Sequence, residues 1–370
     1  MLQHMSRPTV RSYLEKKDSN KPVGRLDQTI ISSSGSIVSV NDKPVGEPAV
    51  PFIKSGRCYA NWFLSKFCNY RCFYCVNHHV AKPTEIWDTD AVFRVFAATG
   101  QKWCLGFTGG EPFAYPGFIS ICQKAVEKDF SIYITTNFSP ERAINDFIGS
   151  MDCGMVENIV ISLHITEREK NNGVPAFLRS VDRLRARKFP FEVHYVMHPL
   201  LLERFEADCS FFAQYGIPII PKPFQGEHAG KLYPDSYDEA EQGLILKADP
   251  DVFRRGLFYA RGIPCNAGRY LVHIDTSGAV YRCVGEKTAL GSCATSLRLS
   301  AEARPCKAPF CSCFGWDLLA DESYKAALRG KLSNKAPLWI QARRYLGAWK
   351  RRMSRGKGPS GVGKKQTAHP

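Results

Sequence analysis

The sequence predicts an α/β fold, in which a partial (β/α)6 TIM-type barrel is followed by a small cysteine-rich α+β domain. Six short apolar runs alternate with amphipathic segments between residues 58 and 221. Strands that alternate with helices at this spacing form parallel βαβ units. No antiparallel interruption breaks the series, and this favours an open barrel whose chemistry lies at the carboxyl ends of the strands. A second cysteine-rich stretch begins at residue 265.

The first segment, residues 1–57, is rich in Ser, Pro, Gly and Lys and contains no recognisable chemistry. Residues 30–40 are the one stretch in it that could form a small hairpin. We therefore expect an N-terminal extension.

The barrel is expected over residues 58–262. Its predicted strands are 58–64, 102–107, 130–135, 156–163, 191–197 and 217–221, and its predicted helices are 88–98, 117–128, 141–150, 175–187 and 201–214. The loop after the sixth strand holds Lys222, Gln225, Glu227 and His228, which either contact a substrate or belong to a plain surface loop.

The second cysteine-rich stretch is expected to form a domain over residues 263–325. Residues 270–274 and 279–284 alternate in polarity around Asp275–Gly278, which is typical of a hairpin. Such a hairpin would bring Cys265 and Cys283 close together.

The tail, residues 326–370, carries twelve Lys and Arg and no Asp or Glu, and it supplies most of the net charge of +15. A helix is predicted over 337–353 because its apolar residues would lie along one side and its basic residues along the opposite side. The helix is expected to dock on the body. Binding of RNA or of anionic lipid by the tail is the alternative.

The composition is that of a globular protein. No apolar run is long enough to span a bilayer, and the first twenty residues lack a signal-peptide core. We therefore expect a cytoplasmic protein without a transmembrane segment. Fourteen cysteines in such a protein are more often metal ligands or free thiols than disulfides.

Three cysteines at C-x3-C-x2-C spacing, Cys68, Cys72 and Cys75, follow the first predicted strand. Sulfur ligands this close together select an iron–sulfur cluster or zinc. A cubane cluster normally takes four cysteines, so three would leave one iron open. A zinc site completed by His78 or His79 remains the alternative.

The cysteine triplet, followed by Gly109-Gly110-Glu111-Pro112 after the second strand, resembles the radical S-adenosylmethionine (SAM) superfamily. The resemblance implies a [4Fe–4S] cluster on Cys68, Cys72 and Cys75. It also implies that SAM binds the open iron and is cleaved reductively to a 5′-deoxyadenosyl radical, which abstracts hydrogen from a substrate.

The resemblance also implies a set of cofactor contacts. Gly109 to Glu111 would meet the methionine amine, and Tyr74 would lie at the adenine edge or simply pack over the loop. Asn137 and Ser162 would contact the ribose or the carboxylate, although Asn137 is also a good start signal for the next helix.

The second cysteine stretch resembles the SPASM and twitch domains of that superfamily, which hold auxiliary iron–sulfur clusters. Six cysteines lie beyond residue 260, so a twitch-like domain with one [4Fe–4S] cluster fits better than two clusters. The implied ligands are Cys265 and Cys283 with two of Cys306, Cys311 and Cys313. A zinc ribbon is the alternative.

These features together predict a radical SAM oxidoreductase that acts on a small molecule or carbohydrate. A flavodoxin or ferredoxin would serve as its low-potential electron donor, and an auxiliary cluster could make the reaction a net oxidation. The alternatives are a peptide-modifying SPASM-type enzyme, an RNA-modifying enzyme that uses the basic tail, and a zinc-bound scaffold without catalysis. The residues do not reveal the substrate.

Overall fold

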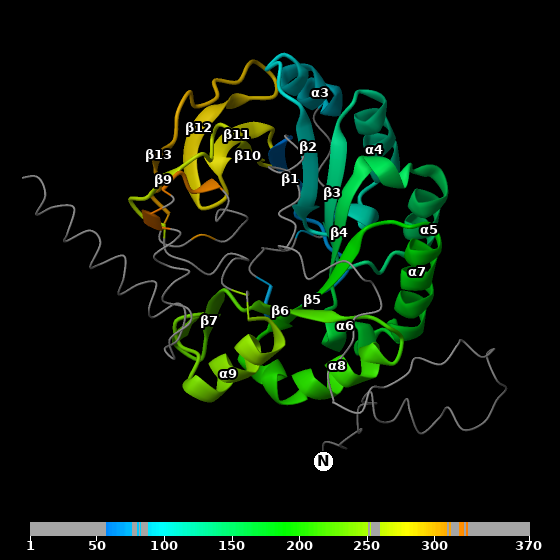
Figure 1. Cartoon of the computed structure of the whole chain (residues 1–370). Helices are drawn as coiled ribbons and strands as arrows, with labels where there is room; N and C mark the ends of the chain where they lie inside the picture. Colours follow the sequence, from blue (N-terminus) through cyan, green and yellow to red (C-terminus); the bar gives the residue numbers. More distant parts are fainter. Residues whose placement is uncertain are drawn as a thin grey trace, which may run out of the picture.

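The computed structural model describes residues 57–75, 80, 82, 88–250, 252, 260–308, 311, 318–321, 323 and 324. Its centre is a nine-stranded sheet with the strand order β12-β11-β10-β1-β2-β3-β4-β5-β6 (Figure 1). The six strands β1 to β6 run parallel to one another. This confirms the α/β class and the open, partial barrel.

The parallel strands lie close to their predicted places. Their bounds are Cys58–Ser65 for β1, Trp103–Gly109 for β2, Ser131–Thr136 for β3, Val156–Ser162 for β4, Phe191–Met197 for β5 and Ile219–Pro223 for β6. In β2 the run from Trp103 to Phe107 is buried throughout, as expected for a strand covered on both faces.

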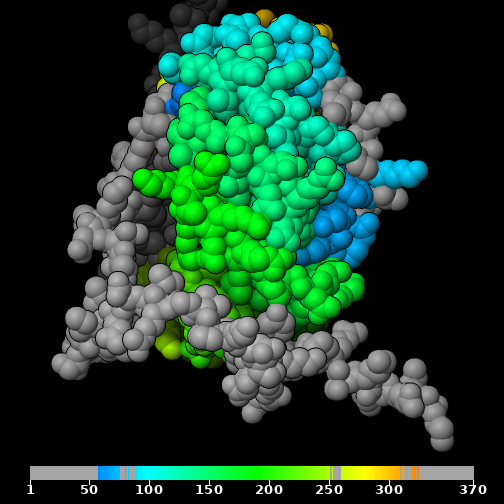
Figure 2. Space-filling view, turned by 90° about the vertical axis from the view of Figure 1, so that its right-hand side faces the viewer, coloured from blue at the N-terminus to red at the C-terminus, as the bar shows by residue number. Residues whose placement is uncertain are grey.

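Helices cover the outer side of the curved sheet (Figure 1). They are α3 (Thr89–Ala97), α4 (Phe118–Glu127), α5 (Glu141–Ser150), α6 (Ile165–Lys170), α7 (Val174–Ala186), α8 (Phe205–Ala213) and α9 (Glu239–Ala248). Figure 2 shows this helical side as one continuous surface. The carboxyl ends of the strands therefore carry the open side of the fold.

Each covering helix buries one stripe of side chains. In α5 the buried residues are Ile144, Phe147 and Ile148, which recur at the spacing of one helix face. Phe147 packs edge to face on Phe113 of the short helix η1 (Pro112–Ala114), with ring centroids 5.3 Å apart. This packing holds the segment after β2 against the helical layer.

The hairpin of the second cysteine stretch joins the central sheet. Strand β10 (Leu271–Ile274) runs parallel to β1, with Tyr59 opposite Leu271 and Trp62 opposite Ile274. Strands β11 (Ala279–Cys283) and β12 (Glu286–Ser292) continue antiparallel. The predicted hairpin around Asp275–Gly278 is thus confirmed, and it extends the barrel sheet beyond β1.

Several small elements were not predicted. They are α6, the hairpin of β7 (Gly226–His228) and β8 (Lys231–Tyr233), helix α9, strand β12, the pair of β9 (Pro264–Cys265) and β13 (Arg304–Pro305), and the short helix η2 (Cys153–Met155). The predicted helix 201–214 is divided into η3 (Pro199–Arg204) and α8. A proline at position 199 favours the first turn of a helix. The segment that begins there, η3, is a 3₁₀ helix, which is wound more tightly than an α-helix.

Some sequence predictions fall outside the described residues. These are the hairpin at 30–40, the helix at 337–353, and the positions of His78, His79 and Cys313. Within the described part of the chain, no helix has both the length and the apolar character to cross a membrane.

Candidate active site

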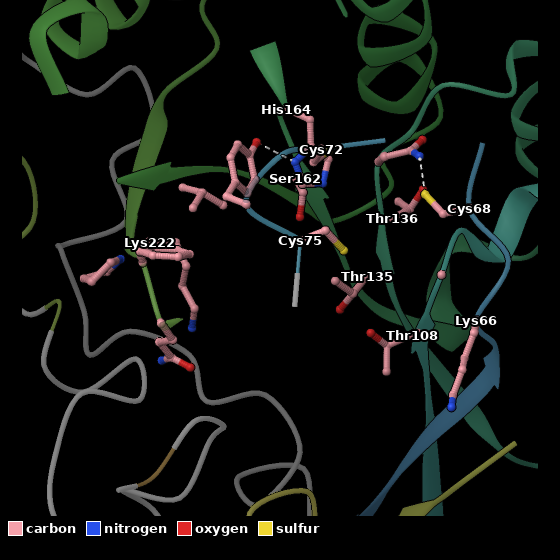
Figure 3. A pocket seen from close by; sticks show the side chains of 18 residues that line it. Lys66, Cys68, Cys72, Cys75, Thr108, Thr135, Thr136, Ser162, His164 and Lys222 are labelled. Atoms are coloured by element: carbon pink, nitrogen blue, oxygen red, sulfur yellow. Dashed lines mark hydrogen bonds between the residues drawn. The ribbon is translucent and has the colours of Figure 1, made fainter. Parts of the chain in front are cut away.

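A cavity of about 290 Å³ lies at the carboxyl ends of the parallel strands (Figure 3). Every strand from β1 to β6, or the loop that follows it, supplies part of the lining. The lining residues are Lys66, Cys68, Cys72, Tyr74, Cys75, Thr108, Gly109, Gly110, Thr135, Thr136, Asn137, Ser162, His164, Val196, Lys222, Pro223, Phe224 and Gln225.

The cysteine loop, residues 66–75, leaves β1 and brings Cys68, Cys72 and Cys75 to this cavity. Burial raises the pKa of the Cys72 thiol to about 12, and the neighbouring charges of Cys68 and Cys75 act in the same direction. Burial also raises the pKa of Cys68, to which Cys75 contributes. The three thiols are therefore within reach of one another's charge, and a metal centre would have to displace their protons.

These thiols suit an iron–sulfur cluster by their chemistry, because soft sulfur donors from one short loop face a common space. Among the residues that the structure describes, no group of three or more His, Cys, Asp or Glu side chains has the spacing to hold a metal ion.

The diglycine bend, Gly109-Gly110, lies directly against the start of the cysteine loop. The Gly110 N–H donates to the Ser65 carbonyl at 2.7 Å, and the Glu111 N–H donates to the Phe67 carbonyl at 2.7 Å. A Cβ atom on Gly110 would be 1.8 Å from the Phe67 oxygen. The glycines therefore let two chain segments approach each other, besides presenting backbone to the cavity.

Glu111 does not line the cavity. Its carboxylate is buried and accepts hydrogen bonds from the Thr136 hydroxyl at 2.6 Å, the Asn137 N–H at 2.6 Å and the Phe113 N–H at 3.0 Å. Burial raises the pKa of Glu111 to about 7, although these hydrogen bonds oppose the shift. Glu111 thus ties the bend after β2 to the end of β3.

Asn137 and Ser162, which end β3 and β4, both line the cavity. The Asn137 Nδ2 donates to Asn69 Oδ1 at 2.9 Å and approaches Cys68 Sγ at 3.6 Å. It gives no side-chain cap to α5, but its Oδ1 accepts the Ser139 N–H at 3.0 Å, so its side chain joins the cysteine loop to the turn before α5.

Tyr74 lines the cavity between two of the cysteines and pairs with His164. The Tyr74 hydroxyl lies 2.9 Å from His164 Nδ1. His164 has a left-handed backbone with φ 44°, which is strained for a residue with a Cβ. Burial lowers the pKa of His164 to about 3, so this ring is neutral at pH 7.

Arg168, on α6, is a buried residue of the site that sequence analysis missed. Its Nε donates to the Leu163 carbonyl at 2.7 Å, and its other nitrogens donate to the carbonyls of Asn137 and Phe138. The guanidinium therefore fixes the ends of β3 and β4. A short helix directly after a strand leaves little periodic signal, and this is why Arg168 was not found.

Sequence analysis also missed Lys66, Thr108, Thr135 and Thr136, all of which line the cavity. Their signal was available, because each lies at or just beyond the carboxyl end of a predicted strand, where barrel chemistry gathers.

The second cysteine group comprises Cys265, Cys283, Cys306 and Cys311. Burial raises the pKa of Cys265 to about 12 and that of Cys283 to about 11, and the charges of Cys306 and Cys311 contribute to both shifts. Cys265 and Cys283 thus each lie within reach of the charges of Cys306 and Cys311, and the common site expected for Cys265 and Cys283 stays a prediction.

Arg282 holds this second group together. It is buried and ion-paired with Glu286, and it donates to the carbonyls of Cys265 at 3.0 Å, Ala267 at 3.0 Å, Arg304 at 2.6 Å and Pro305 at 3.1 Å. It therefore joins β11 to the segments before Cys306 and around Cys265. A single arginine within a predicted strand gave no sign of this role.

Comparison with known proteins supports the interpretation of the first site. The model of the radical SAM superfamily matches residues 62–212, the stretch that contains the cysteine loop and the diglycine bend. No curated protein matches the chain significantly.

Several solved structures are similar to part of this chain at low identity. A structure of anSMEcpe with bound AdoMet is 17% identical over 65% of this chain and 79% of its own, with a TM-score of 0.49. SuiB of Streptococcus suis bound to S-adenosylmethionine is 14% identical over 64% of this chain and 63% of its own, with a TM-score of 0.46. BtrN in complex with AdoMet and 2-DOIA is 13% identical over 64% of this chain and 78% of its own, with a TM-score of 0.36.

Proposed function

We propose that this protein is a radical SAM enzyme whose [4Fe–4S] cluster is held by Cys68, Cys72 and Cys75. One observation carries the proposal: the three thiols and the diglycine bend line a single cavity inside the segment that matches the radical SAM superfamily. Cluster and SAM together would supply a 5′-deoxyadenosyl radical that abstracts hydrogen from the substrate, and the protein would bind, orient and shield them.

The proposed SAM contacts are those residues that reach the cavity: Tyr74, Gly109, Gly110, Asn137 and Ser162. Gly109 and Gly110 offer backbone polar groups without a side chain in the way. For Glu111 we propose a supporting role, because its carboxylate accepts hydrogen bonds from η1 and from the end of β3.

We propose a second [4Fe–4S] cluster on Cys265 and Cys283 with two of Cys306, Cys311 and Cys313. The charges of Cys306 and Cys311 act on the pKa values of both Cys265 and Cys283, which supports this, and Cys313 lies outside the described residues. Such a cluster could take an electron from the substrate, which would make the reaction a net oxidation.

The predicted small-molecule substrate and a flavodoxin- or ferredoxin-type electron donor remain part of this proposal. The same is true of the division into an extension at 1–57, a core at 58–262, an auxiliary domain at 263–325 and a basic tail at 326–370. Peptide or RNA substrates and the cytoplasmic location stay predictions from the sequence.

The test is anaerobic reconstitution with iron and sulfide, followed by dithionite and SAM. We expect formation of 5′-deoxyadenosine by the natural protein and none by Cys72→Ala. Cys153→Ala is the matched control, because Cys153 is half-buried in η2 and takes no part in the cavity. Iron-loaded protein that forms no 5′-deoxyadenosine would contradict the proposal.

A further inference from the structure

Helix α6 directs three consecutive charged side chains to three different parts of the molecule. Glu167 reaches the cysteine loop, Arg168 reaches the ends of β3 and β4, and Glu169 reaches η3. Successive residues of a helix point in different directions, so one short helix can make all three contacts. Because only two residues separate α6 from β4, the helix lies beside the carboxyl ends of the strands.

Glu167 binds the backbone of the cysteine loop. Its Oε2 accepts the Arg71 N–H at 3.2 Å, and the residue is 8% exposed. The other carboxylate oxygen, Oε1, lies 3.8 Å from Nζ of the exposed Lys170. Arg71 directly precedes Cys72, so Glu167 holds the backbone from which the second cysteine of the triplet projects.

Neutral groups hold the parts of the loop on either side of this contact. The Asn69 Nδ2 donates to Ser139 Oγ at 2.8 Å, and its Oδ1 accepts from Asn137 Nδ2 at 2.9 Å. Beyond the contact, the Cys75 N–H donates to the Cys72 carbonyl at 3.1 Å. Glu167 therefore completes a series of anchors that runs along the loop.

An ion-pair network fixes the other side of α6. The Arg204 guanidinium of η3 binds both carboxylate oxygens of Glu169, at 2.7 and 2.9 Å. The same guanidinium binds Asp208 of α8 at 2.8 and 2.9 Å. Asp208 is buried and also accepts the Tyr195 hydroxyl at 2.8 Å. Movement of α6 would break contacts between largely buried charges, which is costly, so the carboxylate of Glu167 is held in place.

The charge of Glu167 does not explain its place beside the thiols. Glu167 lies within reach of the charge of Cys72, and a carboxylate repels a thiolate. On charge alone, Glu167 would make it harder to assemble a thiolate-bound metal centre here. The favourable contribution of Glu167 is therefore the hydrogen bond to the Arg71 N–H, which a neutral acceptor of the same shape can also make.

We propose that Glu167 is a positioning residue for the first cluster: by holding the Arg71 N–H, it keeps Cys68, Cys72 and Cys75 turned toward the cavity before iron binds. The inference rests on the proposed function, because the position of the thiols matters for the reaction only if they hold the cluster. Groups that orient metal ligands from outside typically contribute about 10–100-fold to metal affinity.

The first test uses the full chain without iron and follows hydrogen–deuterium exchange by mass spectrometry. In Glu167→Ala the Arg71 amide should exchange at least about tenfold faster, which corresponds to about 1.4 kcal/mol. The change should be confined to residues 66–75, and exchange in α5 should stay as in the natural protein. Glu167→Gln should restore slow exchange, because its amide oxygen still accepts the Arg71 N–H.

The second test uses the same proteins after anaerobic reconstitution. Glu167→Ala should lose iron to a chelator about tenfold faster, and the electron paramagnetic resonance signal that SAM alters should decrease in the reduced protein. Glu167→Gln should match the natural protein in both measurements. The matched control is Glu206→Ala, because Glu206 forms an exposed ion pair with Lys247 and does not line the cavity. This control should retain its iron.

Natural exchange or natural iron retention in Glu167→Ala would overturn the inference. Equal defects in Glu167→Ala and Glu167→Gln would also overturn it, because the charge and not the hydrogen bond would then be required. Formation of 5′-deoxyadenosine is measured in the same preparations. Its absence from iron-loaded natural protein would refute the proposed function, while the exchange of the iron-free chain would still decide whether Glu167 holds the loop.

Discussion

At the scale of single residues, the diglycine bend shows how little room the site allows. A Cβ on Gly110 would meet the carbonyl oxygen of Phe67 at 1.8 Å and its carbon at 2.4 Å. Both are backbone atoms of the cysteine loop, so relief would require the loop itself to move. Stability and metal loading therefore depend on the same atoms.

We expect Gly110→Ala to lower the free energy of unfolding by about 1–3 kcal/mol, as overpacking does, and to lower the iron content after reconstitution. Denaturant titration and iron analysis measure the two effects. Gly149→Ala is the control, because its added Cβ meets no atom within 4 Å. In helix α5 it should stabilise by about 0.5–1 kcal/mol. Equal behaviour of the two variants would refute the packing argument.

We expect His198 to make the free energy of unfolding of the protein depend on pH. Its Nδ1 accepts the Leu200 N–H at 3.2 Å, and its ring packs on His228 with centroids 4.5 Å apart. Burial lowers the pKa of His198 to about 4, and the charge of His228 acts in the same direction. Unfolded histidine has a pKa of about 6.5, so the unfolded chain takes up the proton first as the pH falls.

The free energy of unfolding should therefore decrease as the pH falls from about 6.5 to about 4. His198→Asn keeps an acceptor for Leu200 but does not titrate, so its stability should change less over this window. Denaturant titrations at several pH values compare the two proteins. Identical slopes would show that His198 does not contribute.

Most residues that line the cavity could be recognised from the sequence because they stand in a short motif or at the end of a predicted strand. Cys68, Cys72 and Cys75 are of this kind, and so are Gly109 and Asn137. Glu111 shows the limit of that approach. The motif names the residue, but only the packing of β2 against β3 shows that its carboxylate turns inward.

At the scale of elements, Arg282 joins segments that are distant in sequence. Lysine cannot replace its fork of hydrogen bonds to four carbonyls and to Glu286. Arg282→Lys should therefore loosen the second cysteine group. If both proposed clusters form, iron should fall from about eight to about four atoms per chain.

Arg298→Lys is the control for this experiment, because Arg298 is exposed on the loop after β12. It should retain the full iron content. Full iron in Arg282→Lys would mean that the cysteines assemble without the arginine.

Helix α9 begins with a reciprocal cap. The Asp238 side chain accepts the Glu241 N–H at 2.9 Å, and the Glu241 side chain accepts the Asp238 N–H at 2.8 Å. Asp238→Ala should cost about 1 kcal/mol of unfolding free energy, whereas Asp238→Asn should remain near the natural protein. Denaturant titration decides between them, and a neutral Asp238→Ala would show that α9 does not need its cap.

Long periodic helices and strands could be predicted from the sequence, and short ones could not. Helix α5 begins and ends at its predicted residues, since a proline precedes it and an apolar stripe runs through it. Helix α6 has only six residues, and four of them are charged, which masks its pattern. Strand β12 has one buried residue, so alternation gives little indication of it.

At the scale of the whole molecule, β1 is an interior strand. It pairs with β2 on one side and with β10 on the other. Removal of all residues beyond 262 would leave β1 as an edge with unpaired backbone groups, which invites aggregation.

We expect a chain that ends at residue 262 to be aggregated in gel filtration, and a chain that ends at residue 330, which keeps β10 to β12, to remain dispersed. A monodisperse short chain with native circular dichroism would show that the barrel segment folds without the hairpin.

The sequence indicated six parallel strands and a later hairpin, but not that they share one sheet. Local patterns set the direction and length of a strand, whereas the choice of neighbour depends on contacts across more than two hundred residues, such as Tyr59 with Leu271. No spacing rule within either segment reveals such a pairing.

The direction of β10 bears on electron transfer between the two cysteine groups. Because β10 runs with β1 and β11 runs back, Cys283 lies level with the beginning of β1, and the cysteine loop leaves from its end. At about 3.3 Å per residue, the eight residues of β1 separate the two levels by some 20–25 Å. If both proposed clusters form, a substrate in the cavity would lose a hydrogen atom at the carboxyl ends of the strands and could pass an electron toward their amino ends.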